Sequence, residues 1–87
     1  MPLNLKLEKI LDKVYAPQER IDGKFSGNDI TYITNERGEP VTLFIGRRRE
    51  GGSISGERYV RRIVRDPATQ LIQKSHWELK GKVIRGA

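Results

Sequence analysis

Apolar residues near the N-terminus recur with helical spacing. Four of them fall at i, i+3, i+4 and i+7, which places their side chains on one face of a helix. They are Leu7, Ile10, Leu11 and Val14. Asn4 can act as the N-cap by accepting a hydrogen bond from a first-turn amide, and Pro17 would end the helix. The pattern predicts an amphipathic helix over residues 4–16 that packs on the domain core.

After this segment the apolar period changes to two, and Gly, Asn and Asp interrupt the chain every few residues, which is the signature of short strands. Strands are expected at residues 21–25, 30–34 and 41–45, with Gly38 at the left-handed position of the hairpin that joins the last two. Residues 70–84 alternate again. The chain from Lys82 onward is expected to form either a final short strand or a frayed tail.

Residues 57–65 support two interpretations. On a helix, Tyr59, Val60, Ile63 and Val64 would gather opposite four arginines, and the basic face could meet duplex DNA. On a strand, each face would mix Arg with apolar residues, which requires a bulge or a strongly twisted edge. β-branched and aromatic residues prefer extended backbone, and the following Asp-Pro-Ala-Thr fits a turn, so we favour the strand.

The predicted fold is a single α+β domain over residues 1–87, with the helix at about 4–16 and a β-rich body at about 20–84. The body is expected to be a mainly antiparallel sheet of about four to six strands, curled into a small roll or barrel. The expected core comprises Leu7, Ile10, Leu11, Val14, Ile21, Phe25, Ile30, Tyr32, Val41, Leu43, Ile45, Tyr59, Ile63, Leu71, Trp77 and Leu79.

Composition narrows the class of protein. The 87 residues suit one domain, and the hydrophobic content of 36% is sufficient for folding. The chain has no cysteine, which excludes disulfides and thiolate chemistry. The N-terminus lacks the pattern of a secretory signal, and no run of about 18 apolar residues is present. We therefore expect a soluble, cytoplasmic protein with no membrane partner.

Charge is distributed unevenly. Residues 1–43 contain six basic and seven acidic side chains, a net charge of −1, whereas residues 44–87 contain eleven and four, a net charge of +7. Seven arginines lie between Arg47 and Arg65. A concentration of guanidinium groups attracts polyanions, and each planar fork can bind phosphate or carboxylate oxygens.

Catalytic motifs are weak or missing. Residues 46–53 partly match the phosphate-binding loop G-x-x-x-x-G-K-[ST], but Gly52 occupies the position that requires Lys. His76 is the only histidine and has no partner that spacing assigns, so it is expected to pack rather than to catalyse. No carboxylate pair has the spacing of a metal or hydrolase site. The sequence predicts a non-enzymatic protein with no cofactor and no metal.

The basic half is the candidate binding site. The expected partner is a polyanion such as single-stranded nucleic acid, with Tyr59 and Trp77 either as stacking rings or as core residues. The alternative is a protein-interaction or accessory domain with no nucleic-acid role. Oligomeric state is not predicted. The candidate site residues are Arg47, Arg48, Arg49, Arg58, Arg61, Arg62, Arg65, Lys74, Lys80 and Lys82.

Overall fold

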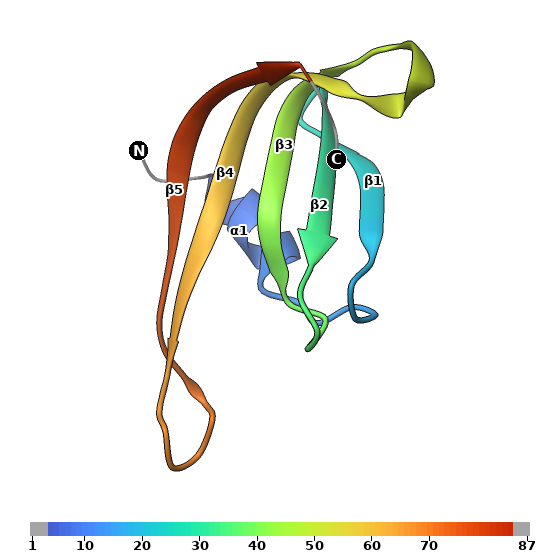
Figure 1. The fold of residues 1–87 in the computed structure, drawn as a ribbon. Helices are drawn as coiled ribbons and strands as arrows, with labels where there is room; N and C mark the ends of the chain where they lie inside the picture. Colours follow the sequence, from blue (N-terminus) through green and yellow to red (C-terminus); the bar gives the residue numbers. More distant parts are fainter. Residues whose placement is uncertain (1–3, 85–87) are drawn as a thin grey trace.

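The computed structural model describes residues 4–84, which form one short helix and a five-stranded antiparallel meander (Figure 1). The strands are ordered β1-β2-β3-β4-β5 in the sheet, so each pairs with its neighbours in sequence. A 3₁₀ turn, η1 (Glu50–Gly52), lies between β3 and β4. The other elements are α1 (Leu5–Leu11), β1 (Arg20–Phe25), β2 (Asn28–Thr34), β3 (Pro40–Arg48), β4 (Ile54–Arg65) and β5 (Ile72–Ile84).

The expected α+β class is confirmed, and the sheet is curled but not closed. Residues 57–65 belong to β4, which confirms the strand interpretation. Each face of β4 mixes Arg with apolar residues, and the β4–β5 pair contains two irregularities, which leave Lys80 and Gln73 of β5 without a register partner. Of the two alternatives for the chain from Lys82 onward, the strand is present up to Ile84 as the end of the continuous β5, and residues 85–87 lie outside the described part of the chain.

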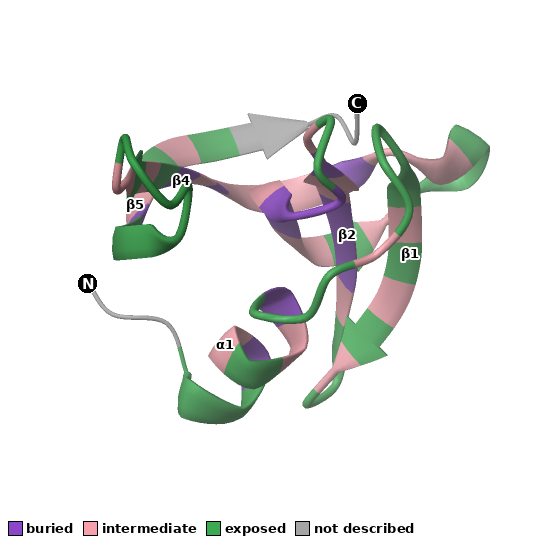
Figure 2. Cartoon of the chain, turned by 90° about the horizontal axis from the view of Figure 1, so that it is seen from below, coloured by how far each residue is buried: buried purple, intermediate pink, exposed green. Residues whose placement is uncertain are grey.

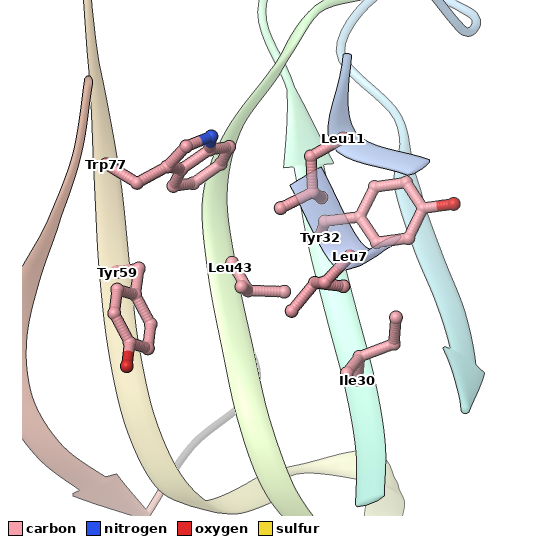
Figure 3. Close-up of a cluster of buried hydrophobic side chains, with 7 residues drawn as sticks. All are labelled: Leu7, Leu11, Ile30, Tyr32, Leu43, Tyr59 and Trp77. Atoms are coloured by element: carbon pink, nitrogen blue, oxygen red, sulfur yellow. The ribbon is translucent and has the colours of Figure 1, made fainter. Parts of the chain in front are cut away.

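The sheet arches over α1, which lies on its concave inner face (Figure 2). The buried cluster joins α1 to four of the five strands, as Figure 3 shows. It contains Leu7, Leu11, Ile30, Tyr32, Leu43, Tyr59 and Trp77. Ile10, Tyr15, Ile21, Phe25 and Ile45 pack against it while partly exposed. The inner face of the sheet and one helical face therefore supply the main core.

Several core predictions are wrong. Val14 is 69% exposed because it follows the end of the helix. Leu71 is also 69% exposed because it lies in the β4–β5 turn. Leu79 is 39% exposed because it is on the open edge strand. Two buried hydrophobic residues within residues 4–84 were not predicted. Phe44 and Ile54 are buried although their strand positions alternate with those of the inner cluster.

The helix is shorter than residues 4–16. Asn4 is the N-cap, as predicted, and its side chain accepts a hydrogen bond from the Lys6 amide at 2.8 Å. The helix ends at Leu11 because the chain turns to join the β2–β3 loop, where the Tyr15 amide donates to the Gly38 carbonyl at 2.7 Å. Gly38 has φ of 80°, and a Cβ there would overlap the Tyr15 carbonyl. No helix within residues 4–84 is long and apolar enough to cross a bilayer.

Two glycines face each other where β3 meets β4 near the loop that joins them. Gly46 and Gly56 are register partners, and a Cβ on either would press against the backbone of the opposite strand. Beyond this pair the β3–β4 tip turns sideways, away from the direction of the strands (Figure 1). The close approach of the backbones allows the tip to lie over β1 and β2, where Gly52 accepts a hydrogen bond from Arg20.

Candidate functional site

The structure divides the predicted arginines into structural and exposed groups. Arg48 belongs to the first group because its side chain extends over the outer face of the sheet and binds backbone and side chains of three elements. Its Nη1 donates to Thr31 Oγ1 at 3.0 Å, Asp22 Oδ1 at 3.2 Å and the Gly52 carbonyl at 3.1 Å. Its Nη2 donates to the Ile30 carbonyl at 2.9 Å. Arg48 thus fastens the β3–β4 tip to β1 and β2.

Asp22 is the carboxylate at the centre of this network. Thr31 Oγ1 donates to Asp22 Oδ1 at 2.7 Å, and Arg20 Nε lies 3.3 Å from the same oxygen. The hydrogen bond from Thr31, and then the charges of Arg20 and Arg48, hold the pKa of Asp22 below its ordinary value despite some desolvation. The network carries one carboxylate and two guanidinium groups, so half of its cationic charge is locally balanced.

Arg61 is also structural, and it is only 8% exposed. Its Nε donates to Ser75 Oγ at 2.6 Å, and its Nη1 donates to the carbonyls of Pro40 at 3.2 Å and Leu11 at 3.5 Å. Leu11 is the last residue of α1, so a cation there also complements the helix dipole. Arg61 therefore ties the helix to β3 and β5 and is unavailable to a partner.

Arg65 is the third structural arginine. It forms an ion pair with Glu39, which is 8% exposed, and its Nη1 donates to the Gln70 carbonyl at 3.1 Å. Arg37, in the β2–β3 loop, donates to Gln70 Oε1 at 3.2 Å. These bonds brace the far end of the β4–β5 hairpin against the β2–β3 loop.

The exposed group lies mainly on the outer face of the β4–β5 hairpin. Strand alternation and register place the side chains concerned on the side of the sheet opposite α1, with Arg62 paired to His76 and Arg58 in the row of Phe44. We call this set the outer cationic face. It consists of the exposed residues Arg62, Lys74, His76 and Lys80 and the half-buried residues Arg58 and Glu78. Four permanent cations and one carboxylate give it a net charge of +3.

Glu78 is surrounded by cations on this face. Lys80 Nζ lies 2.9 Å from Glu78 Oε2, and Arg62 Nη1 and His76 Nε2 each lie 3.9 Å from Oε1. The hydrogen bond from Lys80 is the main reason that the pKa of Glu78 is below its ordinary value, and the charges of Lys80, Arg62 and His76 add to it. The Arg62 and His76 side chains remain 73% and 70% exposed, so their donors face solvent.

Besides the three structural arginines, three further predicted site residues lie apart from the outer cationic face. Arg47 and Arg49 are exposed at the β3–β4 tip. Lys82 would share a face with Lys80 by simple alternation. However, the shift at Lys80 pairs Lys82 with Glu57, whose strand position alternates with that of Arg58. The ten predicted residues therefore form no single surface. Sequence reasoning missed Glu78 and His76 as members of the face, although both alternate in step with Lys74 and Lys80.

The aromatic side chains offer no exposed stacking platform. Tyr59 and Trp77 are core residues, 4% and 6% exposed, which confirms one of the two interpretations from the sequence. Tyr32 and Phe44 are buried as well, and Tyr15 and Phe25 are half-buried. Within the described part of the chain, no group of three His, Asp or Glu side chains could hold a metal ion.

Comparison with known proteins adds no relative from which a role could be transferred. No family model matches the chain, and no match was found among curated proteins or solved structures.

Proposed function

We propose that the protein is a non-enzymatic binding domain for polyanions and that the outer cationic face is its binding surface. The observation that supports this proposal is the set of four cations on one side of a two-stranded hairpin, with a single carboxylate among them. Exposed guanidinium and ammonium groups on a fixed backbone gain affinity by releasing the counterions of a polyanion.

Single-stranded nucleic acid, the partner expected from the sequence, stays a prediction. Its support is weaker than the support for polyanions in general because Tyr59 and Trp77 are committed to the core. Base stacking on exposed rings supplies much of the affinity of single-strand binders. Contacts to the phosphate backbone need no such rings, and these are the contacts that the outer cationic face can make.

The test compares two variants with equal loss of charge. Arg58→Gln, Arg62→Gln and Lys74→Gln together remove three cations from the outer cationic face, whereas Lys6→Gln, Lys9→Gln and Lys13→Gln remove three exposed cations near α1. Binding of labelled oligonucleotides and of inorganic polyphosphate is measured by anisotropy or competition at about 50 and 200 mM salt. The proposal predicts a large loss for the first variant and a small one for the second. Equal losses of affinity in the two variants would show that the outer cationic face is not the binding site.

A protein-interaction role is the second candidate, and the open edge of the sheet favours it. β5 is 13 residues long and pairs only with β4 among the described residues. An edge strand can accept an extended segment of another protein by β-strand addition. Lysines and a bulge, both present in β5, are the usual protection against such pairing. Association that survives nuclease treatment of a lysate would support this role.

A further inference from the structure

We infer that the preferred polyanion is double-stranded DNA, with the distal part of the β4–β5 hairpin lying in the major groove. This inference rests on the proposed function and names its ligand class. Three observations carry it: the projection of the hairpin, its internal bracing and the distribution of charge along it.

The hairpin projects beyond the rest of the sheet. β3 pairs with β4 only as far as Val60, and from Arg61 to Arg65 the partner of β4 among the described strands is β5 alone. Figure 1 shows this two-stranded ribbon extending past the β2–β3 turn. A two-stranded β-ribbon fits the B-form major groove, which is about 12 Å wide, whereas the major groove of A-form RNA is too narrow for side chains to enter.

The ribbon is braced by Arg61 where it leaves the sheet and by Arg65 near its far end. Arg61 bonds Ser75 across the two strands and the Pro40 carbonyl at the start of β3. Arg65 pairs with Glu39, and its Nη1 bonds the Gln70 carbonyl. These contacts fix the ribbon before any ligand arrives, so less conformational entropy is lost on binding. A braced ribbon suits a stiff duplex better than a flexible strand.

The permanent charges on the outer face of the ribbon are cationic. Arg62 and Lys74 occupy its outer face together with His76, and Arg62 and His76 are register partners. The acidic residue at the turn, Asp66, accepts hydrogen bonds from the amides of Ala68 at 2.7 Å and Thr69 at 3.1 Å, which hold its pKa below the ordinary value. These bonds stabilise the ionised form, so Asp66 contributes one negative charge at the turn, beyond the strand positions of Arg62 and Lys74. Duplex DNA presents one phosphate charge per about 1.7 Å of axis, a high density for such a ribbon to meet.

The experiment measures the anisotropy of three labelled probes of about 16 base pairs or nucleotides: a DNA duplex, an RNA duplex and a DNA single strand. Titrations are made at about 50 and 200 mM salt. The intact protein is compared with Arg62→Gln/Lys74→Gln and with the control Lys9→Gln/Lys13→Gln, all checked for folding by circular dichroism. We expect the intact protein to bind the DNA duplex most tightly of the three probes. The ribbon variant, Arg62→Gln/Lys74→Gln, should bind this duplex roughly tenfold more weakly, and the slope of log affinity against log salt concentration should be smaller by about 2. The control should show neither change.

The outcomes separate the inference from the function on which it rests. RNA duplex or single-stranded DNA bound as tightly as duplex DNA would overturn the inference, while a specific loss in the ribbon variant would still support polyanion binding by this face. Duplex DNA that binds with the same affinity to the ribbon variant would overturn the placement in the groove. No binding of any probe at the lower salt would overturn both.

Discussion

Arg61 lies against Trp77, with the guanidinium carbon 6.0 Å from the centroid of the indole ring. The two residues are register partners on β4 and β5, and both are buried. Arg61 belongs to a basic cluster in the sequence, but its guanidinium group is part of the core. There it holds the C-terminal end of α1 against the sheet. A binding surface must therefore be assembled from the cations that remain exposed.

Replacement of Arg61 by Ala should destabilise the protein strongly. The change leaves the carbonyls of Leu11 and Pro40 without their donor and removes the packing against Trp77, so we expect a loss of about 3 kcal/mol in the free energy of unfolding. Arg62→Ala is the matched control on the exposed face and should cost less than about 0.5 kcal/mol. Urea unfolding followed by circular dichroism checks both. Equal stability of the two variants would contradict the structural role of Arg61.

The three consecutive arginines of the β3–β4 tip should respond differently to substitution. Arg48→Ala removes four side-chain hydrogen bonds and is expected to cost about 1–3 kcal/mol, whereas Arg47→Ala and Arg49→Ala should each lie within about 0.5 kcal/mol of the natural protein. Thermal unfolding of the three single variants gives the comparison, with about 4–8 °C expected per kcal/mol. A Tm for Arg48→Ala as high as that of its neighbours would show that the network contributes little.

Much of the fold was predictable because its determinants are local. The helical spacing of Leu7 and Leu11, the alternation around Tyr32 and the left-handed Gly38 each specify a nearby backbone conformation. The β preference of Val and Ile likewise predicted correctly that residues 57–65 form a strand rather than a helix. The helix end was misplaced because a tertiary hydrogen bond from Tyr15 to Gly38, and no local signal, redirects the chain after Leu11.

The candidate site was harder to predict. Arg48, Arg61 and Arg65 resemble their exposed neighbours in sequence, and only long-range partners such as Asp22 and Glu39 distinguish them. The bulge at Lys80 reverses the side on which Lys82 lies, and bulges carry no reliable sequence signature.

The Gly46–Gly56 pair should tolerate no side chain. Gly56→Ala would place a Cβ 2.8 Å from the Gly46 Cα and against the Ile45 carbonyl, so the strands must separate, at a cost of at least about 2 kcal/mol. Gly23→Ala is the control, since its Cβ would make only an ordinary contact with Ile30 at 3.7 Å. That control should be neutral or stabilising by up to about 1 kcal/mol. Equal melting temperatures for the two variants would refute the close approach.

Asp22 should contribute to stability in a pH-dependent way. Its pKa is lower in the folded protein than its ordinary value of 3.8, so the unfolded chain binds more protons in the interval between the two values. The contribution is therefore fully present above about pH 4 and is lost as the pH falls through the folded pKa. Asp22→Asn should be less stable than the natural protein at pH 7, and the difference should shrink as the pH falls below about 4. Denaturation curves measured across this interval provide the check. A stability difference between the two proteins that stays constant with pH would contradict the role of Asp22.

The most direct test of the proposed surface is an NMR titration that follows the Nε–Hε signals of the arginines while a DNA duplex is added. The account predicts large shifts for Arg58 and Arg62 on the outer cationic face and small ones for Arg48, Arg61 and Arg65, whose guanidinium groups are held by the protein. Shifts confined to Arg47 and Arg49 would place the binding surface at the β3–β4 tip and contradict the assignment to the β4–β5 hairpin.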